Sequence, residues 1–269
     1  MPGTVRATNG REEKIMDLQL AGKTAVVTAA SGGIGGAVVR TLIAEGVTVL
    51  GADRTVTDQL KQTGAITVEA DLLTPEGVEQ LRRIAESEFG GVDLLVNGVG
   101  GLAGLDLGGL PDLSDSTWQR AFELNFFSTV RITRALLPSL REAVVNVSTS
   151  VAHWPASGPH WYGASKGALT AFSKGLADEL GPRGIRVNTV SPALIRTPLW
   201  DEYGPRVSQA RGADYQQLMT DLPEQINVTL GRWGTPQEVA NVIVFLASPA
   251  AGYVTGSDYI IDGGLLKVL

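Results

Sequence analysis

Cysteine is absent from this chain of 269 residues. Its absence excludes disulfides, catalysis by a thiolate and zinc sites built from cysteine, and it fits a reducing compartment. Only two histidines are present, His153 and His160, and two are too few for a usual cluster of histidine ligands. We therefore expect no metal site, and we do not expect either histidine to act as the catalytic base.

The sequence also lacks a long apolar run and an excess of positive charge. Its longest uncharged stretch, residues 24–39, is short and is interrupted by Ala-Ser-Gly-Gly, so it does not predict a membrane span. The polar first 18 residues have no apolar core of the kind that secretory signals carry. A net charge of −6 gives no reason to expect nucleic acid, although backbone amides can still hold a small anionic cofactor. We expect a soluble, cytoplasmic protein that binds neither membranes nor nucleic acid.

Short apolar runs alternate with helix-like segments along most of the chain. Runs rich in β-branched residues predict strands, and Pro, Gly or hydroxyl residues mark helix ends. A longer irregular segment precedes the last helix. The predicted strands are residues 24–28, 47–52, 66–70, 93–96, 144–148, 186–191 and 259–261, and the predicted helices are residues 34–45, 75–89, 115–137, 161–180 and 236–247.

Continuous apolar strands separated by helices indicate a parallel sheet that is covered on both faces. We predict an α/β fold: a single-domain, Rossmann-like, doubly wound parallel sheet of about seven strands with helices on both faces. Residues 1–18 are expected to form a flexible tail, and residues 19–269 the domain. No break in composition marks a second domain.

A glycine-rich turn, residues 28–35, joins the first predicted strand to the first helix. In a doubly wound sheet this turn lies at the carboxyl ends of the strands, where free N–H groups of the helix bind a pyrophosphate. Gly33 and Gly35 let a cofactor approach the backbone because they have no Cβ. Asp53 ends the second strand, where a carboxylate binds the adenosine ribose and repels a 2′-phosphate, whereas Arg54 could pair with that phosphate. This pattern favours NAD(H), with NADP(H) as the alternative; a merely tight turn is the other interpretation.

Tyr162 and Lys166 form the most informative pair in the chain. Their spacing of four residues puts both side chains on one face of a helix, about 6 Å apart along its axis. A phenol has a pKa of about 10 in water, and a neighbouring ammonium favours the phenolate and lowers that pKa. The pair therefore predicts a group that transfers a proton. A surface pair on an amphipathic helix is the alternative.

In this order the motifs resemble the short-chain dehydrogenase/reductase family, over about residues 20–265. The turn is similar to the family's Thr-Gly-x-x-x-Gly-x-Gly, with Ala29 in place of the first glycine, which a negative φ would accommodate. The resemblance implies an NAD(P)(H)-dependent oxidoreductase that interconverts a secondary alcohol and a ketone, with Tyr162 as general acid and base. It also implies a homotetramer, or a dimer, and a mobile substrate lid over residues 198–230.

The resemblance also implies roles for single residues. Thr149 stands thirteen residues before Tyr162, where the family has the serine that holds the substrate oxygen; Ser150 is the alternative, and Ser148 is expected to contact backbone. Asn125 matches the asparagine that holds a water in a proton relay from the lysine. Catalytic residues are thus Asn125, Thr149, Ser150, Tyr162 and Lys166, and cofactor-binding residues are Ser31, Gly33, Ile34, Gly35, Asp53, Arg54, Asp71, Leu72, Asn97, Gly98, Tyr162, Lys166, Pro192, Ile195 and Thr197.

Two groups of aromatic residues bear on the substrate. The loop 153–161 ends in Trp161, directly before Tyr162, and Trp200 and Tyr203 begin the expected lid. They suggest a roomy apolar pocket for a small-molecule ketone or alcohol, such as a polycyclic ketone, unless these rings pack in a core or an interface. Sugar alcohols and 3-oxoacyl thioesters remain open. A non-catalytic nucleotide-binding protein of the same fold is the rival hypothesis, and a sugar-nucleotide epimerase would need a larger substrate domain.

Overall fold

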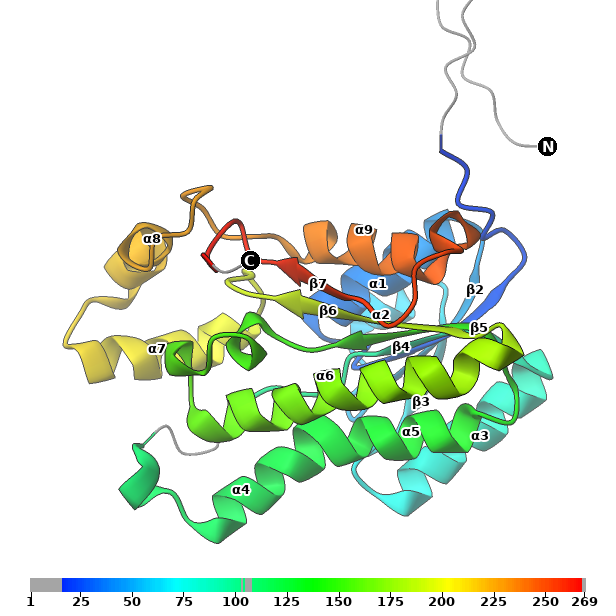
Figure 1. Cartoon of the computed structure of the whole chain (residues 1–269), viewed down its shortest axis with the longest axis horizontal. Coiled ribbons are helices and arrows are strands. Elements are labelled where there is room, and N and C mark those ends of the chain that lie inside the picture. Colours follow the sequence, from blue (N-terminus) through cyan, green and yellow to red (C-terminus); the bar gives the residue numbers. More distant parts are fainter. Residues whose placement is uncertain (1–15, 103, 105–107, 268–269) are drawn as a thin grey trace, which may run out of the picture.

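A parallel sheet forms the centre of the computed structural model, which describes residues 16–102, 104 and 108–267. In this part of the chain the sheet has seven strands in the order β3-β2-β1-β4-β5-β6-β7 (Figure 1). The predicted doubly wound sheet is confirmed. The strands are β1 (Thr24–Thr28), β2 (Thr48–Asp53), β3 (Ile66–Glu69), β4 (Val92–Asn97), β5 (Leu140–Val147), β6 (Arg186–Pro192) and β7 (Asp258–Ile261).

Helices cover both faces of this sheet (Figure 1). One face carries α1 and α9, and the other carries α3, α5 and α6. The helices are α1 (Gly33–Ala44), α2 (Asp58–Lys61), α3 (Pro75–Phe89), α4 (Asp115–Phe122), α5 (Ser128–Leu136), α6 (His160–Leu180), α7 (Leu199–Arg211), α8 (Tyr215–Gln225) and α9 (Pro236–Ala247).

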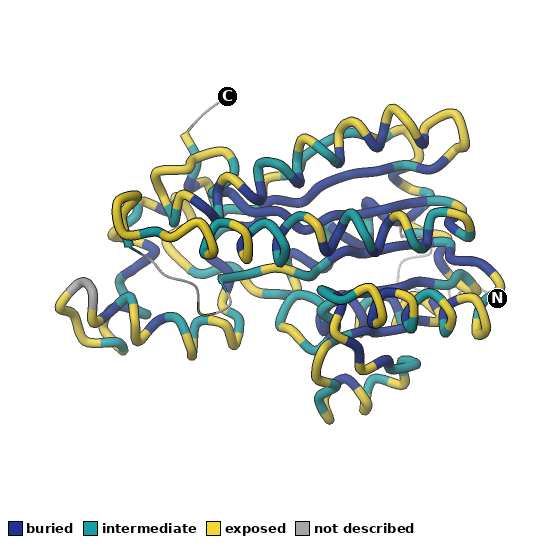
Figure 2. Tube along the Cα trace, turned by 90° about the horizontal axis from the view of Figure 1, so that it is seen from below, coloured by how far each residue is buried: buried dark blue, intermediate teal, exposed yellow. Residues whose placement is uncertain are grey.

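The strands are apolar on both faces because each face packs against helices. Successive side chains of a strand point to opposite faces, so Ala25 and Val27 enter the core beneath α1 and α9, whereas Val26 enters the core beneath α3, α5 and α6. Figure 2 shows the strands as the buried interior, with exposed residues on the outer sides of the helices. A continuous apolar run is therefore what each central strand requires.

The register of the central strands brings their carboxyl ends to one level. Asn97 of β4 lies opposite Asn146 of β5, and Val147 of β5 lies opposite Val190 of β6. The loops that follow these strands therefore leave from the same edge of the sheet. In doubly wound folds ligands bind at this edge.

Local sequence fixes several helix ends. The Thr74 side chain accepts a hydrogen bond from Gly77 N before Pro75 begins α3, and Thr235 with Glu238 forms a capping box at α9. No side chain caps α1, whose N-cap residue is Gly32. The first N–H groups of a helix have no partner within the helix. At α1 they are therefore left to the glycine-rich turn and to whatever binds there.

Two predicted segments differ from the structure. The helix expected over residues 115–137 is α4, a π-helical turn (Glu123–Phe127) and α5. The segment expected to be irregular after β6 contains α7 and α8, which lie together at one end of the sheet (Figure 1). Prolines inside both helices, Pro205 and Pro223, hide them from a local pattern.

Most of the predicted tail, residues 1–15, lies outside the described residues. Of the remainder, Leu18 packs against the core beneath α1. Within the described ranges, the structure contains no helix that combines the length and apolar character of a membrane span. The same ranges contain no group of three or more histidine and acidic side chains arranged to hold a metal ion.

Candidate active site

The turn after β1 folds tightly on itself. Ala29 has a φ of 53°, so it does not adopt the negative φ that would accommodate its methyl group. This left-handed conformation costs an alanine about 1 kcal/mol, because its Cβ approaches the backbone. A Cβ on Gly35 would lie 2.1 Å from Ala29 O, so only glycine fits there. The turn thus places the N-terminus of α1 directly against the end of β1.

Gly35→Ala is expected to destabilise the protein and to weaken dinucleotide binding. The added methyl group meets backbone atoms that cannot rotate away, and such overpacking costs about 3 kcal/mol. Urea unfolding measures the loss. Ala29→Gly is the matched control, with a change below about 1 kcal/mol, because relief of the left-handed alanine opposes the greater freedom of an unfolded glycine. Equal stability of Gly35→Ala and wild type would show that the turn relaxes freely.

Asp53 is fixed beside this turn at the end of β2. Its carboxylate accepts hydrogen bonds from Ser31 N at 2.9 Å and from Arg54 N at 2.7 Å. The Ser31 hydroxyl oxygen accepts from Thr57 N at 3.2 Å, and Arg54 is exposed. The Asp53 carboxylate is therefore hydrogen-bonded to the turn. This is the position at which the sequence predicts a contact with the adenosine ribose.

The loop after β6 reaches the same turn from the other side. A Cβ on Gly33 would lie 2.9 Å from Thr197 Cβ, and Ile195 is 6% exposed and forms a bridge with Gly234. Ile34 packs partly against the core. Two of the predicted cofactor residues, Gly33 and Thr197, therefore lie close together although about 160 residues separate them in sequence.

Other predicted cofactor residues have structural contacts of their own. Leu72 is 4% exposed and packs in the core, whereas Asp71 is exposed and accepts from Leu73 N. The buried Asn97 amide donates to Thr133 Oγ1 at 3.0 Å and to Asn146 Oδ1 at 2.8 Å. This side chain therefore braces β4 against its neighbours. Gly98 N donates to Thr28 Oγ1 at 3.0 Å, which ties β4 to the turn.

Lys166 lies buried at the carboxyl end of β5. Its side chain extends from α6, and Nζ donates to Val147 O at 2.8 Å. A Cβ on Gly100 would lie 2.6 Å from Lys166 Nζ and 2.9 Å from Asn125 Oδ1. Lysine, asparagine and glycine therefore converge on one point, and only a glycine leaves room there.

The π-helical turn between α4 and α5 presents Asn125 to this point. Asn125 Oδ1 accepts from Gly101 N at 2.8 Å, and Nδ2 donates to Gly101 O at 3.2 Å. π-helical turns are rare and occur mostly at functional sites. This π-helical turn interrupts the helix at Asn125, and asparagine is a residue type with a low helix propensity.

Thr149 meets Tyr162 across the loop that joins β5 to α6. Its hydroxyl lies close enough to the Tyr162 phenol to lower the pKa of that group, and it donates to Pro192 O at 3.4 Å. Ser150 is buried in the turn that follows. Ser148 contacts backbone, as predicted, because its hydroxyl donates to Lys166 O at 3.2 Å. Of the three hydroxyl residues, the structure brings Thr149 to the tyrosine.

Burial dominates the electrostatics of both helix residues. It raises the pKa of the Tyr162 phenol; the hydrogen bond with Thr149 acts in the opposite direction, and the nearby Tyr203 phenol adds to the rise. Burial lowers the pKa of Lys166 to about 7. The expectation that Lys166 lowers the phenol's pKa is therefore wrong, because burial raises that pKa instead, and Tyr162 is protonated at neutral pH.

The aromatic residues divide between core and lid. Trp161 is completely buried and packs with Ala121, so of the two alternatives for this ring, a pocket or a core, the structure shows the core. Trp200 of α7 contacts Tyr203 and Trp233, with ring centroids 5.4 and 4.9 Å apart. Since the Tyr203 phenol also acts on Tyr162, this aromatic cluster (Trp200, Tyr203 and Trp233) lies on the catalytic side of α7.

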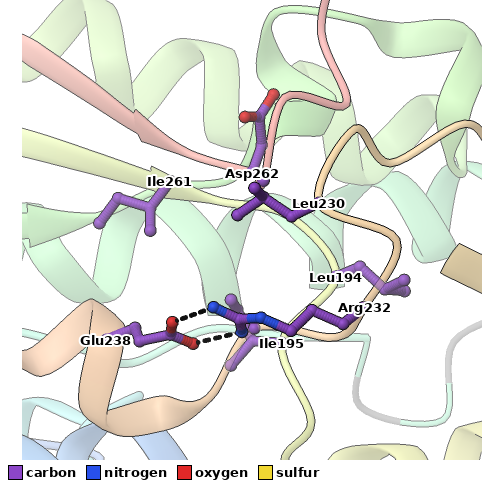
Figure 3. A pocket seen from close by; sticks show the side chains of 9 residues that line it. Leu194, Ile195, Leu230, Arg232, Glu238, Ile261 and Asp262 are labelled. Atoms are coloured by element: carbon purple, nitrogen blue, oxygen red, sulfur yellow. Dashed lines mark hydrogen bonds and ion pairs between the residues drawn. The ribbon is translucent and has the colours of Figure 1, made fainter.

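A cavity of about 90 Å³ lies behind Ile195, between the loops that follow β6 and β7 (Figure 3). It is smaller than the several hundred Å³ that an organic ligand needs. Arg232 and Glu238 point toward one another at its edge, 2.6 Å apart, beside Ile195. This ion pair stabilises the backbone around Gly234, which pairs with Ile195. The cavity itself is too small to be the substrate site.

Sequence reasoning missed three contributors to the site. Gly100 stands two residues after the predicted cofactor residue Gly98, and the pair Gly100-Gly101 was the sequence signal of an unusual backbone. Trp233 holds α8 in place, because its indole N–H donates to Met219 O at 2.7 Å. The Val147 carbonyl could not be found from the sequence, because every residue has a backbone carbonyl.

Comparisons with known proteins agree with this arrangement. Residues 28–266 match the family described as enoyl-(acyl carrier protein) reductase. The chain is 34% identical to the short-chain reductase protein NovJ of Streptomyces niveus, over 89% of this chain and 92% of that protein. It is 32% identical to the 3-alpha-(or 20-beta)-hydroxysteroid dehydrogenase of Mycobacterium tuberculosis, over 94% and 93%. The solved L-sorbose reductase of Gluconobacter frateurii, complexed with NADPH and L-sorbose, is 34% identical with a TM-score of 0.87, over 94% of this chain and 100% of that one.

Proposed function

This chain belongs to the short-chain dehydrogenase/reductase family, and from that membership we propose that it interconverts a secondary alcohol and a ketone with an NAD(P)(H) cofactor. Tyr162 is the general acid and base. The observation that carries the proposal is the convergence of Thr149, Tyr162, Lys166 and Asn125 at the edge of the sheet that also holds the glycine-rich turn.

The residues present fit a nicotinamide dinucleotide. The turn has no room for a Cβ at Gly35, no side chain caps α1, and the Asp53 carboxylate stands beside the turn. Gly33, Gly35 and Asp53 would hold the adenosine half, and Ile195 with Thr197 the carboxamide half. When bound, the dinucleotide supplies the hydride that reduces the carbonyl carbon.

The chain's own residues handle the oxygen and its proton. In reduction, the Tyr162 phenol donates its proton to the carbonyl oxygen, and the Thr149 hydroxyl donates a hydrogen bond to the same oxygen. Lys166 and Asn125 stand behind the phenol and return a proton to it from solvent. In oxidation the phenolate takes the proton of the alcohol. Because burial raises the pKa of Tyr162, the phenol carries its proton at neutral pH, which is the form that the reduction step requires.

We propose NAD(H) as the preferred cofactor, with NADP(H) as the alternative that the NADPH complex of L-sorbose reductase represents. A carboxylate held toward the ribose, as in Asp53, repels a 2′-phosphate. Wild type is expected to show kcat/KM for NADH about tenfold above that for NADPH, and Asp53→Ala is expected to remove the difference.

Arg54→Ala is the matched control for this cofactor test. Arg54 adjoins Asp53 and is exposed, and its loss is expected to leave the NADH/NADPH ratio unchanged. A wild type that prefers NADPH, together with an Arg54→Ala variant that loses this preference, would assign the phosphate to Arg54 and overturn the choice of NAD(H).

The proposed substrate is a bulky apolar ketone or alcohol. The aromatic cluster of Trp200, Tyr203 and Trp233 supports it, with residues 198–230 as the lid. The similar hydroxysteroid dehydrogenase also supports a polycyclic substrate, whereas L-sorbose reductase supports a sugar. We further propose a cytoplasmic homotetramer, or a dimer, to which the exposed side chain of Ile260 on the edge strand β7 would contribute.

The direct test is oxidation of NADH and NADPH in the presence of a carbonyl panel. Polycyclic ketones, 3-oxoacyl thioesters and ketoses are supplied in turn, and the loss of reduced cofactor is followed by absorbance. Turnover is expected with a polycyclic ketone. Cofactor binding, seen by fluorescence, without turnover of any panel member would favour a non-catalytic nucleotide-binding protein instead.

A further inference from the structure

The loop between β5 and α6 carries the candidate catalytic groups at its two ends. Thr149 begins a short 3₁₀ turn, Ser150–Ala152, and Thr149 O accepts from Ala152 N at 3.1 Å. His153 follows at once, with its N–H donating to Ser150 O at 3.0 Å. Backbone hydrogen bonds therefore connect His153 rigidly to Thr149.

The His153 side chain attaches this turn to the sheet. Its Nε2 lies 2.8 Å from Asp258 Oδ2, and Asp258 is the first residue of β7. An ionised carboxylate only accepts hydrogen bonds, so Nε2–H is the donor. The same carboxylate accepts from the Ser191 hydroxyl at 2.8 and 3.0 Å, and Ser191 is completely buried in β6. The Ser191 hydroxyl therefore fixes the Asp258 carboxylate from the sheet side. This carboxylate in turn fixes the His153 imidazole.

These contacts close a ring around Thr149. Ser191 precedes Pro192, whose carbonyl accepts from the Thr149 hydroxyl. One path from Thr149 to β6 is this direct hydrogen bond, and the other runs through the 3₁₀ turn, His153 and Asp258. We propose that His153 is a positioning residue: its hydrogen bond to Asp258 fixes the turn and so sets where the Thr149 hydroxyl stands relative to Tyr162.

This inference rests on the proposed function, because it concerns the oxygen that Thr149 and Tyr162 share. A hydrogen bond to that oxygen strengthens as negative charge develops on it during reduction. If the Thr149 hydroxyl is displaced, its hydrogen bond to the oxygen therefore loses more free energy in the transition state than in the substrate complex. Loss of the His153–Asp258 contact is therefore expected to lower kcat more than it raises KM.

A double-mutant cycle between His153 and Thr149 tests the proposal. His153→Ala is expected to lower kcat about tenfold, with KM for the carbonyl and the Kd for NADH within about twofold. Thr149→Ala is expected to lower kcat about a hundredfold. The double variant should match Thr149→Ala within about threefold, since a positioning residue has nothing left to position. His153→Gln should recover most of the kcat, because its amide N–H can reach the same carboxylate.

Arg141→Ala is the control for the loss of a partly exposed ion pair. Arg141 pairs with Asp93 at 3.6 Å near the amino ends of β4 and β5, at the other edge of the sheet, and its loss should leave kcat unchanged. Two results would overturn the proposal: an unchanged kcat in His153→Ala, or a tenfold loss that persists in the Thr149→Ala background. Absence of carbonyl turnover in wild type would instead reject the proposed function itself, before the cycle is measured.

Discussion

Tyr162→Phe is expected to lower kcat for carbonyl reduction about a thousandfold, because it removes the proton donor and leaves the ring in place. The phenylalanine ring keeps the contact with Trp161, whose centroid lies 5.9 Å away. Thr149, beside the lost hydroxyl, keeps its hydrogen bond to Pro192 O. Thermal stability and NADH binding should therefore stay close to wild type while turnover nearly disappears.

Single-turnover absorbance of bound NADH, with a saturating ketone, separates this effect from binding. Tyr259→Phe, on β7 and partly buried, is the matched control and should keep the wild-type rate. A Tyr162→Phe variant with near wild-type turnover would show that another group protonates the oxygen. The proposed chemistry would then be wrong, whatever the cofactor.

Lys166→Met is expected to lower kcat about a hundredfold, at the level of a lost acid–base partner, and to change how stability depends on pH. Lys166 is 2% exposed, and burial lowers its pKa from 10.5 to about 7. Between these two values the unfolded chain holds a proton that the folded chain has released. Since stability rises with pH wherever the unfolded state binds more protons, wild type gains stability through this window.

The size of this gain is up to about 1.4 kcal/mol per pH unit. Methionine has no proton to release, so the gain is absent in Lys166→Met. Urea unfolding of both cofactor-free proteins at pH 7, 8 and 9 measures the difference, which should move in favour of wild type as the pH rises. A difference that is constant across these pH values would show that Lys166 keeps its proton in the fold, and that its burial does not set its charge.

The elements that the sequence predicted well are those with local signals. Thr74 and Pro75 mark the start of α3, and a left-handed Gly90 follows its end, so neighbouring residues determine that helix. The buried strands followed from their apolar runs. α7 and α8 did not, because Pro205 and Pro223 break the local pattern. These helices form by burying side chains such as Leu218 and Leu222 against Leu194.

Packing decided two features that the sequence left open. Ala29 adopts a positive φ because the turn must bring its carbonyl onto Gly35, and the surrounding structure imposes the conformation that an isolated alanine avoids. Trp161 is a core residue beside Ala121, whereas its position in the sequence next to Tyr162 left both a pocket and a core open. A sequence gives neighbours along the chain, and these outcomes depend on neighbours in space.

The amino-acid sequence alone determined that Tyr162 and Lys166 share one face of a helix, because the helical repeat fixes a spacing of four residues. Only the tertiary structure decided their charges. Burial of Lys166 against Val147 O and Gly100, and of Tyr162 beside Thr149 and Tyr203, sets both pKa values. The free energy of a charge depends on the solvent and dipoles around it, and here segments distant in the chain supply those surroundings.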